Sequence, residues 1–126
     1  MSSKFSKQRL AAFKKQFGRC YYCGSPMWQD NPKEFAIKHV ISKPEATRFQ
    51  CTAEHLLARC DGGENQQSNI VAACLFCNKT RHHNRKNSPT PTEYRKLIQN
   101  RLNRGKWFPK SLRHFVSQCE KENQRY

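Results

Sequence analysis

Long apolar runs and acidic residues are both scarce in this chain of 126 residues. Hydrophobic residues make up 36% of the sequence, and the mean hydropathy is −0.99. No run of about 18 apolar residues is present, which excludes a transmembrane helix. Lysines at positions 4, 7, 14 and 15 interrupt the region where a secretory signal needs an apolar stretch. We therefore expect an intracellular protein that is cytoplasmic or associated with the nucleoid.

The small apolar supply also limits the size of the hydrophobic core. A chain of this length and composition can build one small core at most. Small domains that lack a sufficient core often add disulfides or a structural metal. The seven cysteines of the sequence are the obvious candidates for that support.

Acidic residues number nine against 24 lysines and arginines, which gives a formal net charge of +15. The excess lies at the two ends of the chain. Residues 1–19 hold six basic and no acidic residues, and residues 79–126 hold 13 basic and three acidic ones. The segment between them holds five basic and six acidic residues. Local clusters of one sign favour a polyanionic partner, because cations that neutralise phosphates release counterions. The alternative is an ordinary soluble surface.

These charges and the cysteine spacing divide the chain into three segments. We expect a basic N-terminal helix over residues 1–19, a core over 20–87 and a basic helical extension over 88–126. In the first segment Ser6 is a candidate helix cap, apolar residues follow at helical spacing, and Gly18 marks the end. In the third, Thr90, Pro91 and Glu93 form a capping box with proline at the first helical position. A final short helix is expected after position 109.

The core segment contains two expected strands. The run FQCTAEHLL over residues 49–57 leads to a turn at residues 61–63, and NIVAA over 69–73 follows it. These two strands can pair as a hairpin with a long loop. The polar segment NKTRHHNRKN after the hairpin can be helical if a ligand holds its side chains. Residues 35–41 are compatible with either a short strand or a short helix.

Four of the cysteines form two pairs with the same spacing. They are Cys20 and Cys23, and Cys74 and Cys77. Two such Cys-x2-Cys pairs predict a structural four-thiolate zinc site, because this spacing lets both sulfurs of a pair reach one tetrahedral ion. A redox motif is the alternative for either pair alone, but neither pair follows a βαβ pattern.

Three cysteines remain outside these pairs. They are Cys51, Cys60 and Cys119. We expect them to be small buried hydrophobic residues. A second metal site that uses Cys51 and Cys60 is the alternative.

The polar residues around the cysteine pairs occur in a recognisable order. The string AEHLLARCDGG is followed by NIVAACLFCN and then by KTRHH. Over about residues 20–86 this order resembles the HNH family of metal-dependent nucleases. The resemblance implies an α+β fold with a ββα-metal core, in which a hairpin is closed by a helix around one divalent cation. It also implies a DNA endonuclease that hydrolyses phosphodiester bonds.

The resemblance assigns roles to individual residues. It makes His55 the general base and Asn69 the asparagine that positions the loop, and it makes Glu54 and Asn78 ligands of the catalytic cation. Neutral imidazole suits proton abstraction near neutral pH. Carboxylate and amide oxygens suit Mg²⁺ or Mn²⁺. His82 lies four residues after Asn78, so both can reach one ion from a helix, and its nitrogen extends the plausible metals to Ni²⁺ and Zn²⁺.

Each of these residues also has a simpler interpretation. A histidine such as His55 can be only a hydrogen-bond partner, Asn69 can be a turn residue, and Asn78 can be a helix cap. Glu54 stands where aspartate is frequent in the family, and the cation can take Asn78, His82 or both. Adjacent strand residues point to opposite faces, so Glu54 and His55 come close only if the strand ends or bulges there.

Two arginines are candidates for gripping phosphate. Arg81 adjoins the predicted ligands and Arg59 lies near the end of the first strand. The expected partner is DNA, with RNA the less favoured substrate and a homodimer possible. A rival hypothesis is a zinc-dependent nucleic-acid-binding module without catalysis. A third is a nuclease subunit of a larger restriction, phage or repair assembly.

Overall fold

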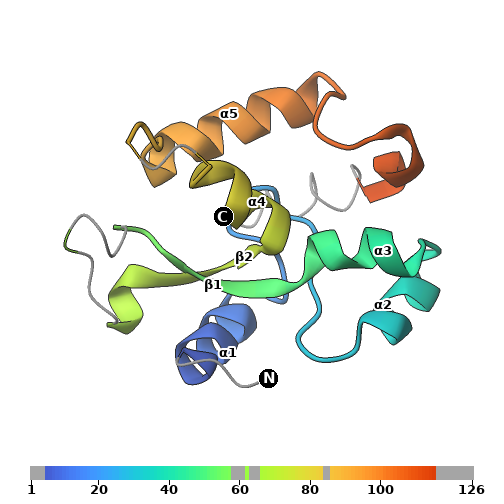
Figure 1. Cartoon of the computed structure of the whole chain (residues 1–126), viewed down its shortest axis with the longest axis horizontal. Helices are drawn as coiled ribbons and strands as arrows, with labels where there is room; N and C mark the ends of the chain where they lie inside the picture. The colour runs from blue at the N-terminus through green and yellow to red at the C-terminus, as the bar shows by residue number, and fades with distance from the viewer. Residues whose placement is uncertain (1–4, 58–61, 63–65, 84–85, 116–126) are drawn as a thin grey trace.

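The computed structural model describes residues 5–57, 62, 66–83 and 86–115, which form a mixed helical and stranded fold (Figure 1). The α-helices are α1 (Ser6–Lys15), α2 (Pro32–His39), α3 (Lys43–Ala46), α4 (Leu75–Arg81) and α5 (Pro91–Asn103). The strands are β1 (Cys51–His55) and β2 (Ile70–Cys74). The 3-10 helices are η1 (Thr47–Phe49), η3 (Gln67–Asn69) and η4 (Lys110–Phe115).

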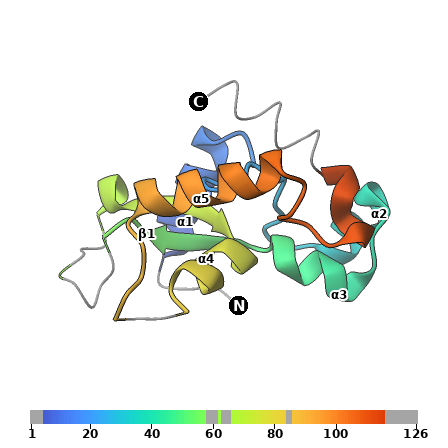
Figure 2. The same cartoon turned by 90° about the horizontal axis from the view of Figure 1, so that it is seen from above.

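The centre of the fold is an antiparallel hairpin of β1 and β2. The pairing runs without a bulge from Cys51 opposite Cys74 to His55 opposite Ile70. α4 begins directly after β2, and α1 and α4 lie on opposite sides of the hairpin (Figures 1 and 2). Along β1, Glu54 faces α4, whereas His55 faces the start of α1. The predicted two-stranded antiparallel sheet is confirmed, although β1 is shorter than the expected run because η1 precedes it.

Local sequence signals explain several helix boundaries. Thr90 and Glu93 form the predicted capping box at the start of α5. The undetermined stretch after position 31 is helical in α2, where the Asn31 side chain accepts a hydrogen bond from the Glu34 backbone. The N-terminal prediction is wrong by one position, because Ser6 is the first residue of α1 and the cap is Phe5.

One hydrophobic core draws residues from all three predicted segments. The core contains Ala12 from the N-terminal segment, Phe49 from the central segment and Phe115 from the C-terminal segment. The rings of Phe49 and Phe115 stack with their centroids 4.4 Å apart. α5 adds Tyr94, Ile98 and Leu102, all buried. The basic flanks therefore pack on the central segment rather than forming separate units.

The last predicted helix is observed in part. η4 covers Lys110–Phe115 and buries Leu112. The apolar spacing that predicted this helix continues through Val116 and Cys119, which lie outside the described residues. In the part of the chain that the structure describes, no helix has the length and apolar character needed to cross a membrane.

Candidate metal centre and adjoining polar cluster

The two Cys-x2-Cys pairs converge on one buried point. The Sγ atoms of Cys20, Cys23, Cys74 and Cys77 all lie within 4.8 Å of one another. In a tetrahedral site with metal–sulfur bonds of about 2.3 Å, neighbouring sulfurs are about 3.8 Å apart. The Sγ atoms of Cys23 and Cys74 are 4.0 Å apart. The four cysteines therefore fit one metal ion such as zinc, as the spacing predicted.

Polar groups of the surrounding chain point at these sulfurs. The backbone N–H of Tyr22 donates to Cys20 Sγ at 3.4 Å, and that of Cys77 donates to Cys74 Sγ at 3.4 Å. The Ser25 hydroxyl lies 3.0 Å from Cys23 Sγ. Such contacts support thiolate sulfur and orient metal ligands. Burial also raises the pKa of the Cys77 thiol, so four thiolates here require a cation to balance their charge.

Among the described residues, Cys51 is the one further cysteine, and it is not part of this group. Cys51 is buried in the core, and burial raises the pKa of its thiol to about 12. It therefore has the apolar role expected for it. Cys60, its proposed partner in a second metal site, lies outside the described residues, as does Cys119.

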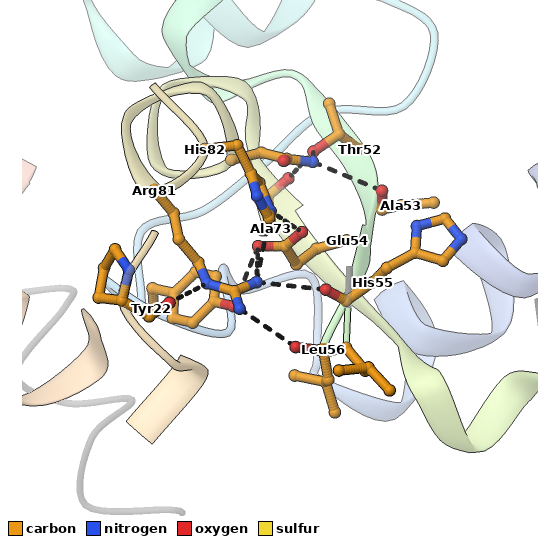
Figure 3. Close-up of polar contacts among 12 residues, drawn as sticks. Tyr22, Thr52, Ala53, Glu54, His55, Leu56, Ala73, Arg81 and His82 are labelled. Atoms are coloured by element: carbon orange, nitrogen blue, oxygen red, sulfur yellow. Dashed lines mark hydrogen bonds and ion pairs between the residues drawn. The ribbon is translucent and has the colours of Figure 1, made fainter. Parts of the chain in front are cut away.

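A second cluster of polar side chains surrounds Glu54, which is 1% exposed. Glu54 Oε2 accepts hydrogen bonds from the Tyr22 hydroxyl and from Arg81 Nη1, both at 3.0 Å (Figure 3). Glu54 Oε1 lies 2.8 Å from His82 Nε2. These partners come from the first cysteine pair and from α4 with its C-terminal cap. The fold thus brings together two of the predicted cation ligands, Glu54 and His82.

Arg81 occupies the interior of this cluster and is 5% exposed. Besides Glu54, its guanidinium donates to the carbonyl oxygens of His55 at 3.2 Å, Leu56 at 3.1 Å and Pro89 at 3.0 Å. The side chain closes the hairpin end onto the chain that follows α4. Its burial favours this internal role over the phosphate contact expected for it. Arg59, the other expected phosphate contact, lies outside the described residues.

The His55 imidazole points away from Glu54 (Figure 3). β1 and β2 stay paired up to His55, the last residue of β1, and no bulge turns its side chain back toward Glu54. Instead the ring makes an edge contact with the Phe5 ring, with centroids 5.1 Å apart. The structure therefore places the predicted base and the predicted metal ligand on opposite faces of the strand.

Asn69 holds the chain immediately after His55. Its Oδ1 accepts from the Leu57 backbone N–H at 2.8 Å, and its Nδ2 donates to the Leu57 carbonyl at 3.1 Å. Its own carbonyl accepts from the Leu56 N–H at 2.9 Å. Three hydrogen bonds thus tie the end of β1 to the residue before β2.

Asn78 lies on α4 and faces β1. Its Nδ2 donates to Thr52 Oγ1 at 3.0 Å and to the Ala53 carbonyl at 3.4 Å. The N-cap of α4 is Cys74, so Asn78 does not cap this helix. None of the hydrogen bonds described for Asn78 reaches Glu54. The structure therefore pairs His82, and not Asn78, with the buried carboxylate.

Sequence reasoning missed Tyr22, whose hydroxyl bonds to Glu54 across 32 positions of the chain. Its signal in the sequence is only a polar aromatic residue inside a Cys-x2-Cys pair. Among the described residues, the four cysteines form the one group of three or more Cys, His, Asp and Glu side chains that can hold an ion. Comparisons with known proteins add no assignment, since no family model, curated protein or solved structure matches this chain.

Proposed function

We propose that this protein is a zinc-stabilised, metal-dependent endonuclease of the HNH type that hydrolyses DNA phosphodiester bonds. The observation that carries the proposal is the contact between Glu54 Oε1 and His82 Nε2, at 2.8 Å, between the hairpin and the end of α4. The resemblance to HNH nucleases implies a catalytic cation in such a setting, between a hairpin and a helix. In this proposal the four cysteines hold a structural zinc ion.

The donor chemistry of Glu54 and His82 fits a divalent cation. Two ligands at right angles, each about 2.1 Å from one ion, are themselves about 3 Å apart. The oxygen and nitrogen already have that spacing. Asn78, one turn before His82 on α4, is the candidate third ligand. When bound, Mg²⁺ or Mn²⁺, or alternatively Ni²⁺ or Zn²⁺, would stabilise charge on the phosphate and on the departing 3′ oxygen.

His55 is the proposed general base. It would take a proton from the water whose oxygen attacks phosphorus, and the bond from phosphorus to the 3′ oxygen would break. Asn69 and Arg81 support this role, because both hold backbone atoms within two residues of His55.

The charge distribution supports a polyanionic substrate. All of the excess positive charge belongs to residues 1–19 and 79–126, which flank the near-neutral centre. On α5 the side chains of Lys96 and Arg101 are exposed. Cations of this kind supply affinity for phosphates that does not depend on base sequence.

A plasmid-nicking assay tests the proposal. Purified zinc-loaded protein with added Mg²⁺ or Mn²⁺ should convert supercoiled DNA to the nicked form, and His55→Ala should cut at least 100-fold more slowly, as expected on loss of a general base. His114→Ala is the matched control, because His114 is exposed and contacts the His39 carbonyl far from the hairpin end. Equal cutting by His55→Ala and the wild-type protein would refute the proposed base.

The arrangement of His55 and Arg81 favours one rival function, a non-catalytic zinc-dependent nucleic-acid-binding module. Arg81 already balances the charge of Glu54, and His55 faces the other side of the strand. This rival predicts DNA binding that survives removal of free divalent ions, with no cleavage under Mg²⁺, Mn²⁺, Ni²⁺ or Zn²⁺. A nuclease that works within a larger assembly would instead regain cutting when its partner proteins are added.

A further inference from the structure

Tyr22 connects the four-cysteine centre to the Glu54 cluster. It lies between Cys20 and Cys23, and its hydroxyl donates to Glu54 Oε2 at 3.0 Å (Figure 3). We propose that Tyr22 is a positioning residue, through which the first cysteine pair orients the Glu54 carboxylate toward His82. This inference rests on the proposed function, because it gives Glu54 the role of a cation ligand.

The surroundings of Tyr22 hold its ring in place from several directions. Its backbone N–H donates to Cys20 Sγ at 3.4 Å, and its carbonyl accepts from Gln99 Nε2 at 2.9 Å. Its ring meets the Tyr94 ring edge-on, with centroids 4.9 Å apart. The side chain is completely buried. The constrained ring therefore places the hydroxyl beside Glu54 Oε2.

The hydroxyl is a permanent donor in this site. A tyrosine hydroxyl carries an O–H donor at neutral pH, and this one lies 3.0 Å from Glu54 Oε2. Glu54 Oε2 is engaged by Tyr22 and Arg81, which leaves Oε1 directed at His82. Partners of this kind fix the orientation of a ligand and tune its affinity for metal.

This arrangement makes the zinc centre more than a support for the fold. Folding of the first cysteine pair around an ion would fix the position of the Tyr22 ring. The hydroxyl on that ring then fixes the orientation of the Glu54 carboxylate. A cysteine pair with another residue at position 22 would still supply its two sulfurs to zinc. Arg81 would then be the remaining described donor to Glu54 Oε2. The ring alone cannot replace the hydroxyl.

Binding of Mn²⁺ to the zinc-loaded protein tests the proposal without relying on activity. In calorimetric titrations, Tyr22→Phe should weaken Mn²⁺ binding by about tenfold or more, the range for loss of an outer-shell partner. Tyr21→Phe is the matched control, since it removes a hydroxyl from the same cysteine pair and Tyr21 is not among the partners described for Glu54. Its Mn²⁺ affinity should stay within twofold of wild type. Equal affinities for Tyr22→Phe and Tyr21→Phe would overturn the positioning role.

A double-mutant comparison separates positioning from a general structural effect. In a Glu54→Gln background, Tyr22→Phe should cause no further loss of Mn²⁺ affinity, because Tyr22 acts through the carboxylate. A further loss of equal size would overturn the proposal. All variants should retain one zinc ion and the wild-type circular dichroism spectrum. If Tyr22→Phe does not fold, the hydroxyl proton of Tyr22 in the wild-type protein provides the test: slow exchange with water supports the contact, and fast exchange refutes it.

The same titrations distinguish the two proposals. A wild-type protein that binds Mn²⁺ and nicks DNA, with Tyr22→Phe unchanged, refutes the positioning role alone. A wild-type protein that neither binds Mn²⁺ nor nicks DNA refutes the proposed function, and the positioning role fails with it.

Discussion

Arg81 and Glu54 form a buried ion pair, with Arg81 Nη1 3.0 Å from Glu54 Oε2 and both side chains at most 5% exposed. The pair joins β1 to α4, and the same guanidinium also binds the carbonyls of His55 and Leu56. One side chain thus neutralises the buried carboxylate and closes the end of the hairpin. This relationship explains how a short hairpin tolerates a charged residue in its interior.

Removal of Arg81 should destabilise the fold strongly. Arg81→Met leaves Glu54 buried without its cation, and loss of one partner of a buried pair costs about 3–5 kcal/mol. The free energy of unfolding from urea denaturation of zinc-loaded protein measures the loss. Arg101→Met, at an exposed position of α5, should change it by less than about 0.5 kcal/mol. A loss below about 1 kcal/mol for Arg81→Met would contradict the structural role given to this pair.

Metal binding by the four cysteines should weaken as the pH falls. Hydrogen bonds with the neighbouring Cys20 and Cys23 thiols raise the pKa of Cys74, and burial raises that of Cys77, so protons compete with the ion throughout the neutral range. Each proton displaced contributes a factor of ten per pH unit, so zinc affinity should rise at least about tenfold from pH 6 to pH 7. Competition with a chelator of known affinity measures it. An affinity independent of pH would show that the thiols do not bind the ion.

Single cysteine substitutions should separate the metal ligands from the core cysteine. Cys77→Ser should lose stoichiometric zinc and lower the melting temperature sharply, because the metal joins both ends of the central segment. Cys51→Ser should keep one zinc ion per chain, because Cys51 lies outside the four-cysteine group. Elemental analysis of the purified variants decides between these outcomes, and loss of zinc from Cys51→Ser would contradict the assignment.

Asn69 should matter for the hairpin end more than its partly exposed position suggests. Asn69→Ala removes both side-chain bonds to Leu57, so the Leu57 amide should lose most of its protection from hydrogen exchange. Cutting should fall by about tenfold or more if His55 is the base, since a small displacement of a catalytic group is costly. Asn69→Asp keeps the acceptor for the Leu57 N–H and should retain part of that protection. Unchanged protection in Asn69→Ala would contradict the observed contacts.

DNA binding should depend on the basic flanks and not on the cations of the centre. We consider the substitution of Lys96, Arg101 and Arg104 by Gln. The slope of the logarithm of the binding constant against the logarithm of salt concentration should become shallower by up to about 0.9 for each phosphate that is no longer neutralised. Lys33, Lys38 and Lys43 provide a control with the same change of charge at exposed central positions. Fluorescence anisotropy over a range of salt concentrations compares the two triple variants. Equal effects would show that net charge alone matters.

Much of the fold follows from local patterns. The capping box of Thr90 and Glu93 predicted α5, and two β-compatible runs separated by a turn signal predicted the hairpin. The start of α2 also had a local signal in Asn31 and Pro32, although the periodicity of the segment did not distinguish strand from helix. The candidate site was less predictable, because its members meet through tertiary contacts.

The sequence alone determined that four of the cysteines form two pairs with the spacing of metal ligands, because that property depends on a spacing of three positions. It also determined where positive charge is concentrated along the chain. The tertiary structure decided that the Tyr22 hydroxyl meets Glu54, that Arg81 points inward and that β1 has no bulge at His55, which leaves the His55 ring on the face that strand alternation predicts. These outcomes depend on strand pairing and on how α4 packs against the hairpin, which bring together residues far apart in the sequence. Local spacing contains no information about which distant side chains meet on each face of the hairpin.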